Sequence, residues 1–242
     1  VRGANKVLES NDSDAENEPS AGAERVKSFD SNGFTHGNSG AVNENSQTYV
    51  AWNWNGGGST VTNNNGSISS QVRANPTAGF SIVTYTGNGT DGATVGHGLG
   101  VTPQVTIIKD RTTGSRDWIV NHPDLTSGKV LFLNDTSAEL TNGGGTPTTF
   151  NSTTIRLDSG SSGLLGINHS SDNYVMYAFS EVAGYSKFGI YTGNGNADGT
   201  FVFLGFRPAF VLTKGTWGGN WNCLLYTSDA ADEGLGVDLG GR

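Results

Sequence analysis

Short apolar runs rich in β-branched and aromatic residues recur along the chain at intervals of roughly ten residues. Clusters of Gly, Asn, Asp, Ser and Pro, the residues that turns favour, separate these runs. The runs lie at residues 48–54, 80–87, 101–110, 117–122, 129–134, 148–157, 173–179 and 188–193. No segment repeats its apolar residues with the 3.6-residue period of an amphipathic helix. The pattern therefore predicts an all-β protein of antiparallel β-sandwich or jelly-roll modules in tandem, with little or no helix.

Composition supports this fold class and narrows the range of partners. Of the 242 residues, 37 are Gly and only 15% are charged, against about 25% in an average domain. The formal net charge of −8 argues against a nucleic-acid partner, because binding to phosphate needs surface Lys and Arg. No apolar run reaches the roughly 18 residues of a membrane-spanning helix, so we expect no membrane insertion.

One motif occurs twice. The letters YTGNG stand at residues 85–89 and again at 191–195, and the similarity continues downstream as far as Lys109 and Lys214. Gly and Asn accept the positive φ of tight turns, so the motif predicts a turn rather than a ligand site. The residues assigned to this structural motif are Tyr85, Gly87, Asn88 and Gly89 in the first copy, and Tyr191, Gly193, Asn194 and Gly195 in the second.

A second similarity lies upstream of these turns. In residues 43–54 and in residues 168–179, an Asn is followed six positions later by Tyr-Val-x-aromatic-x-aromatic. The repeated unit is therefore a set of strands: an aromatic strand, the YTGNG strand with its turn, and a strand entered by Pro. Similarity at this spacing indicates duplicated β-domains rather than a solenoid of short repeats.

These similarities divide the chain into three native parts and a tail. Residues 1–79 form the C-terminal part of one sandwich with a linker, residues 80–182 the first YTGNG module, and residues 183–222 the start of a second, truncated module. Residues 223–242 differ from everything before them. Translated back into codons, CLLYTSDAADE and GVDLGGR resemble two segments of a transposase-type sequencing adapter. We therefore expect this tail to be adapter read-through rather than native sequence.

The chain offers no recognisable catalytic set and no motif for a cofactor. It has no Gly-x-Ser-x-Gly elbow, and its four His residues are scattered. Glycosidases need paired carboxylates, for which Asp110, Asp117 and Asp124 are the candidates, but their convergence cannot be deduced from the sequence. We predict that the protein is not an enzyme.

Two kinds of binding are open to it. Exposed aromatic rings can stack on sugar rings, and the candidates for glycan binding are Trp52, Trp54, Trp118 and Trp217. Packing in the core is the use that we favour for these side chains, with glycan binding as the alternative. The stretch from Asp30 to Gly33 imitates the start of a calcium loop, with Asp30 and Asn32 as ligands, but it lacks the later ligands and the closing Glu.

Three blocks carry a family resemblance: RGANKVL…SFDSNGFTHG…NENSQTYVAWNW, then NPTAGFSIVTYTGNG…GHGLGVTPQVTIIKDR, and then YVMYAFSEVAGYSKFGIYTGNG…GFRPAFVLTK. Together they resemble virion proteins of marine tailed phages, over residues 1–222. The first block is similar to the end of a concanavalin A-like module of the laminin-G or SPRY type. The resemblance implies a tail fibre or other tail-associated structural protein, and no catalytic residues.

We therefore expect a protein of the virion, extracellular when released. Its partners would be other virion proteins and host-surface polysaccharide, and a homotrimer is suggested by analogy with fibre proteins alone. Two alternatives stay open at the level of sequence: a virion-associated polysaccharide depolymerase, and a secreted cellular lectin or adhesin.

Overall fold

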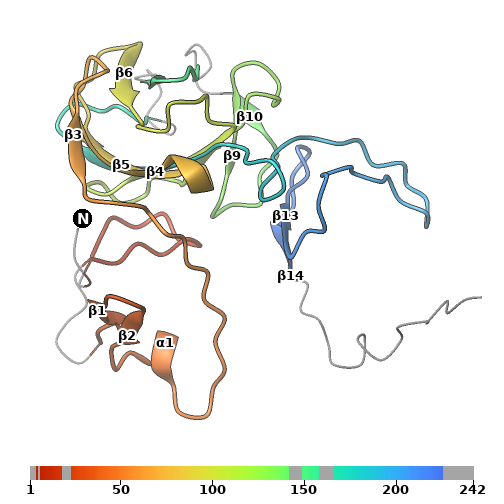
Figure 1. Cartoon of the computed structure of the whole chain (residues 1–242), viewed down its shortest axis with the longest axis horizontal. Helices are drawn as coiled ribbons and strands as arrows, with labels where there is room; N and C mark the ends of the chain where they lie inside the picture. The colour runs from red at the N-terminus through yellow and green to blue at the C-terminus, as the bar shows by residue number, and fades with distance from the viewer. Residues whose placement is uncertain (1–3, 5, 18–22, 142–148, 158–165, 226–242) are drawn as a thin grey trace, which may run out of the picture.

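A single large sheet organises the molecule. The computed structural model describes residues 4, 6–17, 23–141, 149–157 and 166–225. Eight strands, in the spatial order β10-β9-β8-β7-β12-β5-β4-β3, form the sheet, and every neighbouring pair is antiparallel (Figure 1). The strands are β3 (Val61–Asn63), β4 (Ser70–Asn75), β5 (Phe80–Thr86), β7 (Val105–Asp110), β8 (Ile119–Asn121), β9 (Lys129–Phe132), β10 (Leu140–Thr141) and β12 (Asn173–Phe179).

The middle of the sheet is built from segments that are distant in sequence. β12 lies between β5 and β7 and pairs with β5 over all seven of its residues, from Asn173 opposite Thr86 to Phe179 opposite Phe80. On its other side, Tyr174 to Phe179 pair with Asp110 to Val105. Both neighbours of β12 therefore have their inner edges satisfied by one strand that comes much later in the chain.

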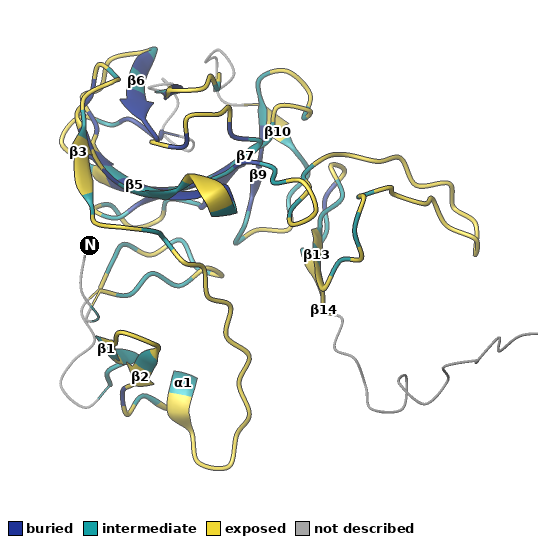
Figure 2. Ribbon diagram, viewed as in Figure 1, coloured by how far each residue is buried: buried dark blue, intermediate teal, exposed yellow. Residues whose placement is uncertain are grey.

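The main core lies on one face of this sheet. There a two-stranded pair, β6 (Ala93–Gly96) and β11 (Thr154–Leu157), covers the alternate residues of the central strands. Val83, Ile108 and Met176 from the sheet meet Val95 and Ile155 from the pair, all fully buried. Figure 2 shows this buried zone between the curved sheet and β6. Period-two alternation produces it, because only every second side chain of each strand faces inward.

The N-terminal segment, residues 6–17, crosses the opposite face. Lys109, fully buried on β7, donates from Nζ to the carbonyl of Ser13 at 3.0 Å. The indole Nε1 of Trp118 donates to the carbonyl of Glu9 at 2.9 Å. Desolvation by burial lowers the pKa of Lys109, and the carboxylates of nearby Asp residues oppose that shift in part. Both of these contacts are to backbone, and the ion pair of Glu16 with Arg111 adds a side-chain contact of the segment itself.

The remaining elements are small. β1 (Val26–Phe29) and β2 (Phe34–His36) form a hairpin, and β13 (Phe210–Thr213) and β14 (Asn222–Leu225) form another. α1 (Gly40–Asn43) and the 3₁₀ turn η1 (Pro76–Ala78) are each one turn. In the described part of the chain, no helix has the length and apolar character needed to cross a bilayer. The predicted all-β, antiparallel fold with little helix is confirmed.

Two predicted strands are not strands in the structure. Residues 48–54 and 188–193 have high β propensity, yet neither belongs to a sheet. Propensity favours a strand only where a partner edge is available, and no described strand pairs with either segment. The sheet also takes in residues 61–75, which the sequence analysis placed with the first part of the chain.

A buried imidazole sits in the core. His97 is inaccessible to solvent; its ring lies with Nε2 3.1 Å from the carbonyl of Asn151, and Nδ1 accepts from the backbone N–H of Leu99 at 3.3 Å. These partners fit the neutral ring with its proton on Nε2. Burial lowers the pKa of His97 from its ordinary value of 6.5.

This geometry predicts a loss of stability in acid. As pH falls through 6.5, the unfolded chain binds a proton at this position before the folded chain does, so the free energy of unfolding decreases. His97→Gln keeps a donor and an acceptor but does not titrate, and it should flatten that part of the pH profile. Urea unfolding at about pH 7 and about pH 5 measures the effect. An unchanged slope in the variant would contradict the assignment.

Candidate functional site

The first YTGNG motif begins in the core and ends in a turn. Tyr85 is only 4% exposed; its ring stacks on that of Tyr174 with centroids 5.0 Å apart. Its hydroxyl donates to the carbonyl of Ile167 at 2.7 Å. Burial raises the pKa of Tyr85 well above its ordinary value, so the phenol stays protonated as that donor.

The segment before β12 packs against this turn and then continues into β12. We call residues 168–179, which include both, the clasp. The fully buried Asn168 donates from Nδ2 to Oδ1 of Asn88 at 3.0 Å and to the carbonyl of Thr90 at 2.8 Å. In return, its Oδ1 accepts from the backbone N–H of Asn88 at 2.9 Å. Its carbonyl accepts from the N–H of Gly89 at 2.9 Å. One Asn therefore bonds to two positions of the motif and to the residue that follows it.

The two glycines of this turn are required for different reasons. Gly89 has φ of +71°, a conformation that other residues adopt at a cost. Gly87 is needed for space, since a Cβ there would overlap the carbonyl oxygen of His169. Its N–H and C=O also bond to the clasp, at Asp172 and Ser171. The motif is a turn that is shaped to receive another piece of backbone.

The second copy forms the same turn, and no described segment clasps it. The N–H of Asn196 bonds to Oδ1 of Asn194 at 3.0 Å, as the N–H two residues after Asn88 does at 2.9 Å in the first copy. Gly195 has φ of +68°. Tyr191, however, is 55% exposed, and a Cβ on Gly193 would meet nothing within 4 Å. The turn is formed by its own residues, and the burial comes from the clasp.

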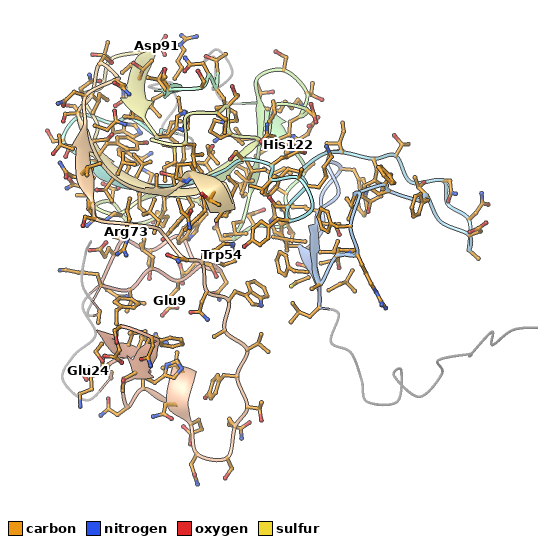
Figure 3. The ribbon with its side chains drawn as sticks, in the orientation of Figure 1. Glu9, Glu24, Trp54, Arg73, Asp91 and His122 are labelled. Atoms are coloured by element: carbon orange, nitrogen blue, oxygen red, sulfur yellow. The ribbon has the colours of Figure 1, made fainter. Side chains whose placement is uncertain are left out.

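The four candidate tryptophans do not form one surface. Trp118 is 5% exposed and is stacked on Tyr177, so it is not part of an exposed surface. Trp54 is half exposed and packs near Phe80, on the same side of the sheet as Arg73 (Figure 3). Trp52 is also half exposed and meets Phe210 edge to face. Trp217 is 84% exposed.

A small pocket lies where the N-terminal segment meets the sheet. Its volume is about 250 Å³, and its wall includes Lys6, Arg25, Phe29, Trp118 and Tyr177. That volume is below the roughly 300–1,000 Å³ of ordinary ligand pockets. Arg25 is engaged by Glu9 in an ion pair, so its charge is already compensated. The pocket can hold a small group against an aromatic wall but does not enclose an oligosaccharide.

The structure does not bring together the acidic residues considered for catalysis. Asp110 ends β7 and accepts from the N–H groups of Thr112 and Thr113, while Asp117 accepts from Asn134 and Asp124 lies beside His122. The neighbour of Asp110 is instead Asp172, and burial together with that carboxylate raises the pKa of Asp110. The pair could not be recognised from the sequence, because 61 residues lie between its two members. The pairing of β12 with β7 brings them together.

The candidate calcium ligands lie in the β1–β2 turn. Asp30 accepts from the hydroxyl of Thr35 at 2.9 Å, and its N–H bonds to the carbonyl of Gly33, which closes the turn. Asn32 is exposed at the tip. Within the described ranges, no group of three or more His, Cys, Asp or Glu side chains is placed to hold a metal ion.

Sequence reasoning missed one repeated feature, the contact made by Lys and Trp on the outer side of each unit. Lys214 donates from Nζ to the carbonyls of Phe132, at 3.1 Å, and Asp135. Trp221 donates from Nε1 to the carbonyl of Phe132 at 2.8 Å. Lys109 and Trp118 bind the N-terminal segment in the same way. The signal was in the sequence, as the aligned Lys109 and Lys214 and the Trp that follows each of them.

The two glycines provide a matched test of the clasp. Gly87→Ala should lower the free energy of unfolding by about 1–3 kcal/mol, because the added Cβ must displace the clasp backbone. Gly193→Ala, the same change at the same place in the second motif, should alter it by less than about 0.5 kcal/mol. Chemical denaturation of both variants measures the difference. Equal effects would mean that the clasp does not restrict the first turn.

Comparison with known proteins gives one family and no functional relative. No curated protein and no solved structure matches the chain. A family model described as a domain of unknown function, DUF7483, matches residues 1–233. Because that match covers nearly the whole sequence, the chain belongs to the DUF7483 family.

Proposed function

We propose that this chain is a structural part of a tailed-phage virion, a tail fibre or tail-associated protein built from β-units in series. The observation that carries the proposal is the repeated hydrogen bonding of a Lys and a Trp side chain to backbone carbonyls. Lys109 and Trp118 hold the N-terminal segment, and Lys214 and Trp221 hold the loop after β9. Each unit thereby holds a stretch of chain from an earlier part of the protein.

Contacts of this kind suit a protein that carries load along its length. A Lys ammonium that bonds to backbone carbonyls does not depend on the side chains it meets, so a unit can be repeated while its loops vary. The second contact is reinforced by backbone pairing, since Glu139 N–H bonds to the carbonyl of Thr216 at 2.7 Å and Gly219 N–H to that of Thr136 at 2.7 Å. Figure 1 shows β13 and β14 beside the β9–β10 end of the sheet.

Attachment to host polysaccharide is the second part of the proposal. Trp217 is almost fully exposed on the turn that follows Lys214, and an exposed indole can stack on a sugar ring while neighbouring Asn and Thr groups bond its hydroxyls. A single such contact is weak. Many copies on one particle would convert it into firm binding.

The structural role is tested in the particles of a phage that encodes this sequence. Purified virions should yield tryptic peptides from residues 61–180 at a constant ratio to the tail proteins, through repeated density-gradient centrifugation. A host-protein peptide serves as the control for carry-over. Recovery of the chain only from the soluble fraction of the lysate would overturn the structural assignment.

The attachment role is tested with the purified chain displayed in many copies on beads. Binding to bacterial surface polysaccharide should fall about fivefold per site for Trp217→Ala, the loss of roughly 1 kcal/mol of ring stacking. Tyr185→Ala removes another exposed aromatic ring, on the turn at residues 182–186, and is the matched control. Equal binding by the parent and both variants would exclude Trp217 as the contact, without bearing on the virion test.

A further inference from the structure

Two carboxyl groups meet where the clasp passes the end of β7. Tyr174 stands opposite Asp110 in the pairing of β12 with β7, so these two side chains lie on the same, inner face of the sheet. Asp172, two residues before Tyr174, is the hydrogen-bonding neighbour of Asp110. Thr113 touches both acids: its N–H donates to Oδ1 of Asp110 at 3.1 Å, and its hydroxyl donates to Oδ1 of Asp172 at 3.3 Å. We call Asp110 and Asp172 the acid pair.

The two oxygens of Asp110 have different surroundings. Oδ1 accepts from the backbone N–H groups of Thr112, at 2.8 Å, and of Thr113. Oδ2 is buried and has no hydrogen-bond partner among the described residues, and the residue as a whole is only 3% exposed. A charged oxygen in that position loses its hydration and gains nothing in return, which is costly. A protonated Oδ2 is a donor instead, and it then needs an acceptor.

Asp172 supplies that acceptor. It is only partly buried, and the hydroxyl of Thr113 already donates to one of its oxygens. When Asp110 is neutral and Asp172 is charged, the O–H of Asp110 points to a carboxylate and no like charges face each other. One proton held between the two groups therefore satisfies Oδ2 and removes the repulsion.

The other titratable groups around the acid pair are engaged elsewhere. They are Lys109 on β7, Arg111 directly after it, Arg116 in the following loop, Tyr85 on β5, and Tyr174 and His169 in the clasp. Lys109 and Arg111 alternate with Asp110 and so lie on the outer face, where they bind the N-terminal segment. The hydroxyls of both tyrosines donate to backbone carbonyls of residues 166 and 167. In the described part of the chain, none of these groups bonds to Oδ2 of Asp110.

We propose that Asp110 and Asp172 share one proton, in a hydrogen bond from Oδ2–H of Asp110 to the carboxylate of Asp172, and that this bond ties the clasp to the end of β7. While the proton is bound, the clasp is held. Loss of the proton places two negative charges side by side, and the clasp loosens at the YTGNG turn. All of these residues belong to the first module, and the proposal does not depend on the proposed function.

The acid pair is connected to the turn through the backbone of the clasp. The carbonyl of Asp172 accepts from the N–H of Gly87 at 2.8 Å, and the N–H of Ser171 donates to the carbonyl of Gly87 at 2.9 Å. On the other side, the N–H of Arg111 donates to the carbonyl of Asn173 at 2.7 Å. Repulsion at the Asp172 side chain therefore acts on hydrogen bonds to both neighbours of β12. We expect the clasp to open at this end, because the rest of β12 is paired on both sides.

The shared proton gives stability a defined dependence on pH. Burial raises the pKa of Asp110 from its ordinary value of 3.8, the charge of Asp172 adds to that shift, and the two backbone N–H donors oppose it in part. Above pH 3.8, the folded chain keeps a proton that the unfolded chain has lost, so the free energy of unfolding falls as pH rises through the raised pKa. His97 contributes with the opposite sign, because its pKa is lowered and its contribution is lost in acid.

Asp110→Asn tests the acid pair, because the amide Nδ2 donates to Asp172 as the protonated acid does and cannot lose its proton. Its folding equilibrium constant should exceed that of the parent chain about tenfold at about pH 8, where the parent buries an unpartnered charge, and the gap should close toward about pH 4. Urea unfolding of the full chain over this range measures both. Because each ratio is taken at one pH, the contribution of His97 cancels.

Asp117→Asn is the matched control. It also removes one negative charge from the module, but the carboxyl of Asp117 accepts from Nδ2 of Asn134 instead of facing a buried acid. It should show no gain in stability that grows with pH. Combining Asp110→Asn with Asp172→Asn should add little to the first change alone, because one amide already removes the repulsion.

Amide hydrogen exchange gives a second measurement, which reports on the clasp itself. Protection of the Gly87 amide relative to that of Ala178, within β12, should fall between about pH 5 and about pH 8 in the parent and stay constant in Asp110→Asn. Equal gains in stability in Asp110→Asn and Asp117→Asn would overturn the proposal, and so would an Asp110→Asn profile parallel to that of the parent. A third contrary result is stabilisation of the parent, but not of Asp110→Asn, by added calcium at about pH 8, since a cation would then hold the two carboxylates together.

Discussion

The insertion of β12 between β5 and β7 is the constraint on which the rest of this molecule depends. An antiparallel sheet must satisfy both edges of every interior strand, and here one late strand does so for two earlier ones. The same strand carries Tyr174, which stacks on Tyr85, and follows Asn168, which holds the YTGNG turn. The insertion of this strand therefore brings about the backbone pairing, the aromatic packing and the fixing of the turn together. In the second unit no described strand pairs with residues 188–193, and there the turn forms but Tyr191 is exposed.

The two faces of the sheet serve different purposes. The inner face is closed by β6 and β11 and gives the module its core. On the outer face, the side chains of Lys109 and Trp118 donate hydrogen bonds to backbone carbonyls of the N-terminal segment. A buried Lys is tolerated there because carbonyl oxygens and nearby carboxylates replace the water it loses. The module is thus stabilised on one side by apolar packing and joined to the rest of the chain on the other by directed polar contacts.

Much of the fold could be predicted from the sequence, and the exceptions have one cause. The strands at 80–86, 105–110 and 173–179 follow from their β-branched and aromatic residues, and the repeat was visible as YTGNG and as the aligned Asn. Residues 48–54 and 188–193 carry the same signals but form no strand, because pairing depends on a partner that local sequence does not specify. The segment that covers Trp118 was equally hidden, because its contact residue Glu9 lies 109 positions earlier in the chain. The repeated Lys and Trp contacts needed three-dimensional neighbours to be recognised.

The long segment of chain between β5 and β12 also sets the order in which the module can form during synthesis. About 90 residues separate the two strands, so at roughly 5–20 residues per second the ribosome delivers β12 some 5–20 s after β5. During that interval β5 and β7 have emerged with open edges, and non-local pairing of this kind is slow to nucleate in any case. The centre of the sheet can close only when the chain has been made as far as Phe179. A nascent module of this design therefore passes through a period in which its most apolar edge is accessible to chaperones and to neighbouring chains.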